Sequence, residues 1–179
     1  MNTVLLGLAM LVAASMHPHM AKNSSHGKAA RRAEKRGTSA EADPNLVVSK
    51  AHGGKVWVMT SSPPDAEGDE LNKWLAGHPS MAEVSRKPND ERWPITYVAV
   101  FKKAPVKGPM TIEFVDKKDP RTLVDQYSSQ PQSGSLVFQD PYDLDVNNGF
   151  NKGHTYIIKV GQIIKGRFIS YATGEVTLK

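Results

Sequence analysis

Residues 154–179 read HTYIIKVGQIIKGRFISYATGEVTLK, and this stretch decides the fold class. Tyr156, Ile158 and Val160 stand two residues apart, which is typical of a β-strand that turns one face toward a core. Glycine-containing turns interrupt the stretch, so it divides into short strands rather than one helix. We predict three strands, at residues 154–162, 166–172 and 175–178.

The order of these strands resembles the C-terminal hairpin of immunoglobulin-like and fibronectin-like domains, in which the last strand bends as it closes the sandwich. The resemblance concerns the strand pattern only, because no Cys…Trp…Cys signature is present. The alternation along the strands predicts that Tyr156, Ile158 and Val160 face the core together with Phe168 and Val176.

Short apolar runs separated by turn residues continue upstream as far as Leu46. Further strands are predicted at residues 46–50, 55–60, 93–103, 110–116, 122–128 and 134–139. One short helix is predicted at 69–77, because Leu71, Trp74 and Leu75 have helical spacing and Gly77 can end it. These nine candidate segments with one helical insert predict an all-β protein, an immunoglobulin/fibronectin-like antiparallel β-sandwich of about seven or eight strands, over residues 45–179.

The N-terminus has the pattern of an export signal. Residues 3–16 form an apolar run that is too short to span a bilayer, which needs about 20 residues. Small residues follow the run, although no Lys or Arg precedes it. We therefore predict a signal peptide at residues 1–21 and a periplasmic or extracellular protein without a transmembrane span.

Residues 22–44 are predicted to be a disordered basic linker, because they lack large apolar side chains. Between residues 22 and 36 there are six basic residues and one acidic residue, whereas the chain from Gly37 onward has 17 of each. The net charge of +5 therefore belongs to the linker. The basic residues are Lys22, Lys28, Arg31, Arg32, Lys35 and Arg36.

These six cations predict attachment to an anionic envelope surface or polymer. A folded part without net charge does not favour nucleic acid as a partner, so none is expected. Because basic and acidic residues are equal in number in the folded part, any affinity for anions is assigned to the linker. Another protein or a glycan is a further possible partner.

The sequence contains no recognisable catalytic motif. The absence of cysteine excludes thiol catalysis, thiolate metal sites and disulfides. His52-Gly53-Gly54 is not accompanied by a Gly-x-Ser-x-Gly motif, so it is interpreted as a turn. We predict a non-enzymatic protein with no catalytic residue and no required cofactor.

One acidic segment could bind a metal ion. Asp143, Asp145 and Asn147 repeat at i, i+2 and i+4, the spacing of the first three oxygen ligands in a calcium loop. The rest of that motif is missing, since Asn148 and His154 stand where glycine and glutamate are expected. Calcium is therefore the alternative cofactor.

Two functions follow from these patterns. The first is an exported, non-catalytic binding or structural module of the cell envelope or secreted space, with Trp57, Trp74 and Trp93 as candidate partner contacts. The alternative is a calcium-dependent adhesin or hydrolase that uses residues 143–147.

Overall fold

A computed structural model describes residues 43–130 and 134–179. The predicted signal peptide and the six basic residues of the linker lie outside these residues. Asp43, which we assigned to the linker, contacts the domain: its carboxylate accepts hydrogen bonds from the backbone N–H groups of Asn45 and Leu136, at 2.8 and 3.0 Å. No helix within these two ranges is long and apolar enough to cross a membrane.

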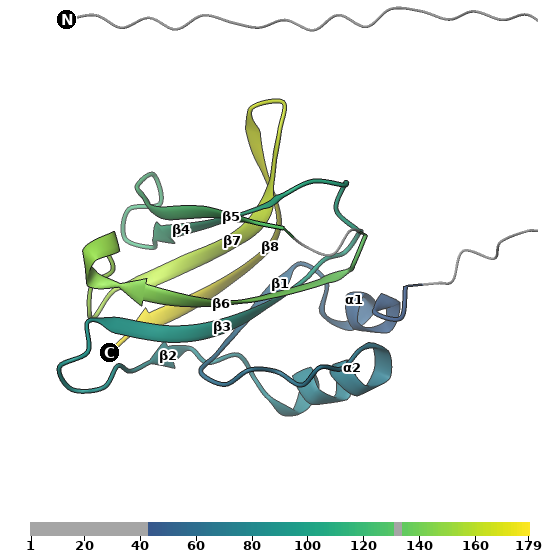
Figure 1. Ribbon diagram of the computed structural model, residues 1–179, viewed down its shortest axis with the longest axis horizontal. Coiled ribbons are helices and arrows are strands. Elements are labelled where there is room, and N and C mark those ends of the chain that lie inside the picture. Colours follow the sequence, from purple (N-terminus) through teal and green to yellow (C-terminus); the bar gives the residue numbers. More distant parts are fainter. Residues whose placement is uncertain (1–42, 131–133) are drawn as a thin grey trace, which may run out of the picture. The chain divides into compact units, whose positions relative to one another are not determined.

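The described part is mostly β-strand, as predicted (Figure 1). Two α-helices and a 3-10 helix accompany the strands: α1 Leu46–His52, α2 Gly68–Gly77 and η1 Val146–Asn148. The strands are β1 Lys55–Met59, β2 Glu83–Val84, β3 Arg92–Val100, β4 Met110–Asp116, β5 Leu123–Ser129, β6 Val137–Asp145, β7 Thr155–Ile164 and β8 Arg167–Leu178.

The strands form one curled sheet, where we expected the two stacked sheets of a sandwich. Their order is β5-β4-β7-β8-β1-β3-β6, with β2 paired to β8. A single parallel pair, Lys55 with Thr173, joins the antiparallel groups β5-β4-β7-β8 and β1-β3-β6. Gly174 permits this joint, because a Cβ atom there would lie only 2.5 Å from the carbonyl oxygen of Val56.

The C-terminal stretch contains two strands instead of the predicted three. Thr173 and Gly174, which we interpreted as a turn, lie inside β8 and pair with Lys159 and Ile158. The glycine at position 174 allows two strands to approach each other closely, and it does not form a turn.

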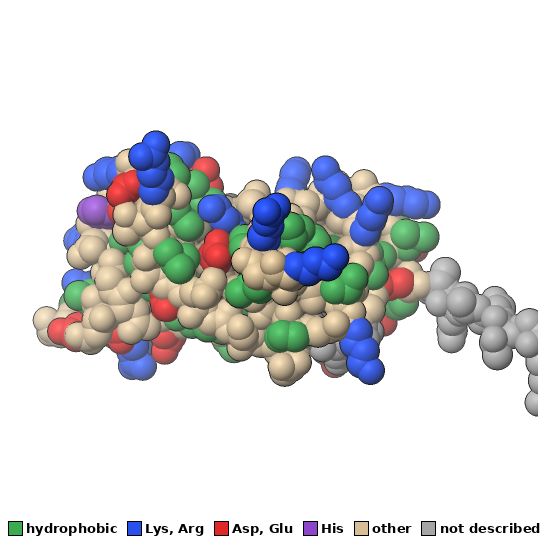
Figure 2. Space-filling model, turned by 90° about the horizontal axis from the view of Figure 1, so that it is seen from above, with side chains coloured by type: hydrophobic (Ala, Val, Ile, Leu, Met, Phe, Trp, Pro, Cys, Tyr) green, Lys and Arg blue, Asp and Glu red, His purple; other side chains and the backbone are tan. Residues whose placement is uncertain are grey.

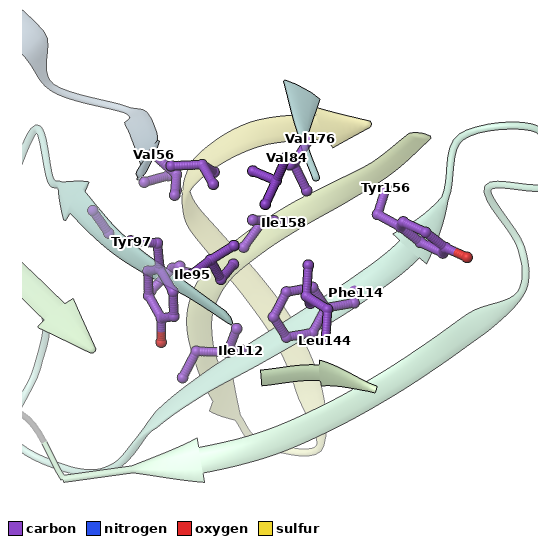
Figure 3. Packing of buried hydrophobic residues seen from close by; sticks show 14 of the residues in the cluster. Val56, Val84, Ile95, Tyr97, Ile112, Phe114, Leu144, Tyr156, Ile158 and Val176 are labelled. Carbon is purple, nitrogen blue, oxygen red and sulfur yellow. The ribbon is translucent and has the colours of Figure 1, made fainter. Parts of the chain in front are cut away.

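The inner face of the curled sheet encloses the main hydrophobic core (Figure 3). The predicted alternation in β7 is confirmed, because Tyr156, Ile158 and Val160 are fully buried. Val176 is also buried, whereas Phe168 is only half-buried. Ile158 lies between Phe114 of β4 and Gly174 of β8 in the sheet register.

Two helices cover the outer face of β1 and β3. The helix predicted at 69–77 is confirmed as α2, and its Leu71 and Leu75 pack in a second core with Trp57 and Val98. This cover explains why both faces of β3 are buried toward its C-terminal end.

The strand predicted at residues 46–50 is wrong, because this segment is α1. Its β-branched pair Val47-Val48 suggested a strand. Tertiary contacts decide instead: Val48 is fully buried in the second core, and the Ser49 hydroxyl donates to the carbonyl oxygen of Phe101 at 2.6 Å.

A seam of tyrosines and carboxylates links the two edge strands, β5 and β6, which share no backbone pairing. The hydroxyls of Tyr97 and Tyr127 lie 2.5 Å apart, and Tyr127 donates to Asp140 of β6 at 3.2 Å. Tyr142 of β6 donates to Asp125 of β5, and its ring stacks on Tyr127 with centroids 4.5 Å apart. Burial raises the pKa of Tyr97, Tyr127 and Tyr142 above the ordinary value.

Candidate functional site

The β7–β8 hairpin extends beyond the rest of the sheet. The pairing of β7 with β4 ends at Gly161, and β1 pairs with β8 only at Thr173. Residues 162–169, which we call the hairpin tip, therefore pair only with one another. Figure 1 shows this hairpin rising out of the body of the domain.

Two glycines fix the geometry of this hairpin. Lys165 and Gly166 form its turn with φ values of +51° and +75°, the left-handed pair of a type I′ turn. A β-bulge follows Val160, and at Gly161 a Cβ atom would lie 2.0 Å from the carbonyl oxygen of Ile169. Only glycine fits there, and a bulge of this kind bends the strand.

A buried glutamine holds the preceding loop against the hairpin. The Gln162 amide donates to the carbonyl oxygens of Val106, Pro109 and Gly108 at 2.9, 3.3 and 3.4 Å. The hydroxyl of Tyr171 donates to the other end of this amide, at 3.0 Å. Gln162 is 3% exposed, and its bonds fix residues 106–109 beside the hairpin.

Aliphatic side chains are exposed on both of these segments. Val106 is 60% exposed, Ile163 55% and Ile169 43%. Ile163 pairs with half-buried Phe168 across the hairpin, and Ile169 pairs with Gln162 on its other face. A small hollow of about 210 Å³ lies between the loop and the hairpin. We refer to residues 102–109 and 162–169 together as the hairpin end.

The hairpin end is also uniformly basic. Neither residues 101–112 nor residues 160–174 contain an acidic residue. Within the described ranges none of its cations forms an ion pair. Figure 2, seen from the side to which the hairpin projects, shows Lys and Arg side chains beside exposed hydrophobic ones. The five cations are Lys102, Lys103, Lys107, Lys165 and Arg167.

A larger hollow, of about 370 Å³, lies between residues 64–67 and β6. Its lining includes the carboxylates of Asp65, Glu67 and Asp140. Two serines also line it, and no histidine that could activate them is among the lining residues. This hollow is therefore a polar recess lined by carboxylates and hydroxyl groups.

The proposed calcium ligands lie on a strand and one turn rather than in a loop. Asp143 and Asp145 belong to β6, and Asn147 belongs to η1. Arg92 donates to Asp143 at 3.3 Å, and Asp145 accepts from the backbone and side-chain nitrogens of Asn147 at 2.8 and 2.9 Å. Nowhere in the described part do three His, Asp or Glu side chains gather as a metal site would require. Calcium binding stays a prediction.

The three tryptophans occupy different environments. Trp93 is fully buried and Trp57 is 8% exposed, so both serve as core residues and present no surface to a partner. Trp74 of α2 is half-buried and stacks on His78, with ring centroids 4.4 Å apart. Among the three candidate contacts, Trp74 alone stays accessible. The six cations of the linker, Lys22 to Arg36, lie outside the described residues.

Comparison with known proteins assigns no family. No family model and no curated protein matches the sequence. Among solved structures, the crystal structure of the Group B Streptococcus pullulanase SAP is similar to 49% of this chain, with 15% identity and a TM-score of 0.29. The match spans 10% of that chain, and a similarity at this level carries no argument about fold or function.

Sequence reasoning missed the hairpin end. The usable signal was local: two segments free of acidic residues, one of which contains the apolar and basic run Ile163-Ile164-Lys165-Gly166-Arg167-Phe168-Ile169. Only the fold brings this run next to residues 106–109.

Proposed function

We propose that this chain is an exported, non-catalytic binding or structural module that attaches to an anionic surface or polymer of the cell envelope or secreted space. The observation that supports this function best is the hairpin end, whose two segments carry five cations, three exposed aliphatic side chains and no acidic residue. The sequence-based interpretation assigned attachment to the linker alone. The placement of cations in the folded domain adds a second basic surface.

The size of the expected attraction follows from the charges. Near an anionic membrane each Lys or Arg contributes about 1 kcal/mol. Five cations at the hairpin end and six in the linker together suffice for stable attachment at low ionic strength. Exposed charges are screened beyond about 8–10 Å at physiological salt, so the attachment should weaken as salt rises.

Export rests on the apolar run at residues 3–16 and the small residues that follow it. Attachment outside the cytoplasm also suits a chain without cysteine, because such a chain needs no disulfide chemistry to fold in an oxidising compartment. Protein isolated from its native host should lack roughly 15 to 21 N-terminal residues by mass spectrometry.

The binding function is tested with the full chain on two matrices, one carrying polyglutamate and one uncharged. We expect retention on polyglutamate at low salt, with affinity falling more than about tenfold between roughly 0.05 and 0.3 M salt. Equal retention on both matrices, or retention that salt does not weaken, would contradict attachment through charge.

A further inference from the structure

The hairpin end combines two kinds of side chain that rarely share one exposed surface. Ile163, Ile169 and Val106 are exposed aliphatic groups, and Lys165 and Arg167 flank them at the turn. Purely polar polymers would use the cations and leave the aliphatic groups in water. The anionic partner must therefore also offer apolar atoms.

We propose that the hairpin tip is a membrane-binding element, which enters the interface of an anionic phospholipid bilayer and places Ile163 and Ile169 among the upper acyl chains. This inference rests on the proposed function and specifies its partner. Lys165 and Arg167 lie nearer the turn than these isoleucines, so the hairpin enters tilted toward the membrane plane, and the long basic side chains extend back to the phosphate groups.

The dimensions of the hairpin fit a shallow entry. From Gln162 to the turn at Lys165 the strand advances about 10 Å at about 3.3 Å per residue. Interfacial elements are buried about 5–10 Å into the boundary between head groups and acyl chains. Deeper entry is unfavourable, because the outer edges of a two-stranded hairpin carry backbone N–H and C=O groups that need water or head groups as partners.

Other binding partners for this surface are the chain's own linker, a second copy of the chain and nucleic acid, and each is less favourable than a membrane. The chain's own linker carries six cations, which would be repelled by the five at the hairpin end. A second copy presenting the same basic surface is repelled in the same way. Nucleic acid binding favours aromatic side chains that stack on bases, whereas the exposed apolar groups here are aliphatic.

Because the chain has no cysteine, one introduced cysteine can carry an environment-sensitive fluorophore. Ile163→Cys places the label at the tip, and Val146→Cys is the matched control, since Val146 is an aliphatic residue, 38% exposed, near the opposite end of β7. The labelled full chains are mixed with vesicles of phosphatidylglycerol and phosphatidylcholine, with vesicles of phosphatidylcholine alone, and with polyglutamate.

We expect the label at position 163 to shift to the blue and brighten at least about twofold with phosphatidylglycerol vesicles only. The label at position 146 should not change in any mixture. The labels report their own surroundings, so insertion of the apolar N-terminal run into the vesicles would not imitate this result.

A second pair of variants tests the same inference without a label. Ile163→Asn with Ile169→Asn should lower vesicle affinity about tenfold and leave polyglutamate affinity unchanged, whereas Leu123→Asn with Val146→Asn, two exposed aliphatic residues outside the hairpin end, should change neither. Folding of each variant is checked by its melting curve.

Three outcomes would overturn membrane entry. Sedimentation with anionic vesicles while the label at position 163 stays in water would leave a purely electrostatic attachment. Binding to polyglutamate but not to vesicles would point to an acidic polymer or protein as partner. In both cases the proposed function survives, whereas absence of binding to every anionic probe would overturn both proposals.

Discussion

Replacing Ile158 with alanine is expected to lower the free energy of unfolding by about 2–5 kcal/mol. Ile158 is fully buried on the inner face of the curled sheet, beside Phe114 in the register of β4. Gly174 lies opposite it on β8 and has no side chain that could fill the cavity. Urea unfolding followed by tryptophan fluorescence measures this loss.

Ile157→Ala is the matched control, because Ile157 is the neighbouring residue, of the same type, and is only half-buried. Its replacement should lower the free energy of unfolding by less than about 1.5 kcal/mol, because Ile157 buries less apolar surface on folding than Ile158 does. A larger loss for Ile157→Ala than for Ile158→Ala would mean that β7 is displaced by one residue, because such a slip exchanges the two faces of a strand.

Raising the pH above about 10 is expected to unfold the domain through its tyrosine seam. Burial raises the pKa of Tyr97 and Tyr127 in the folded state above the ordinary value of 10.0. Their contribution to stability is therefore complete below pH 10 and is lost as the pH rises, because the unfolded chain releases these protons first. Each of the two lowers the free energy of unfolding by about 1.4 kcal/mol per pH unit.

The measurement compares phenolate absorbance with tryptophan fluorescence across an alkaline titration. The absorbance of Tyr97 and Tyr127 should appear only together with unfolding. The variant Tyr97→Phe with Tyr127→Phe should lose stability less steeply with pH, by about 2.8 kcal/mol per unit. Ionisation of both tyrosines in a domain that stays folded would show that the seam between β5 and β6 is open.

Local pattern predicted most of the strands and the one long helix. The alternation in β7 and the spacing of Leu71, Trp74 and Leu75 in α2 were sufficient, because each element buries one face that its own sequence marks. The pattern failed at residues 46–50, where Val48 is buried by packing against strands that are remote in the sequence. Tertiary contacts of this kind do not produce a regular spacing of apolar residues in the local sequence.

The joining of the strands into one sheet could not be read from the sequence. It depends on the single pair of Lys55 with Thr173 and on the space that Gly174 leaves beside Val56. A glycine between two apolar runs is more often a turn, and that interpretation produced the third C-terminal strand that the structure lacks.

The hairpin end was missed because the net charge of the domain does not show where its basic and acidic residues lie. From Gly37 onward basic and acidic residues are equal in number, yet residues 102–109 and 162–169 contain no acid. The hydrogen bonds of Gln162 bring these two segments together across more than fifty positions of sequence. A balanced domain can therefore present a strongly basic surface.

The most direct test of the central claim compares two variants of the full chain that have the same net charge. One replaces the five cations of the hairpin end with glutamine. The other replaces five exposed cations elsewhere, namely Lys73, Lys117, Lys118, Arg121 and Lys152.

Both variants are titrated with polyglutamate at low salt, beside the unmodified chain. The account predicts that the hairpin-end variant loses at least about tenfold in affinity, whereas the control variant loses less than about threefold. Equal losses in the two variants would contradict the account, because attachment would then depend on total charge and not on the surface that the β7–β8 hairpin builds.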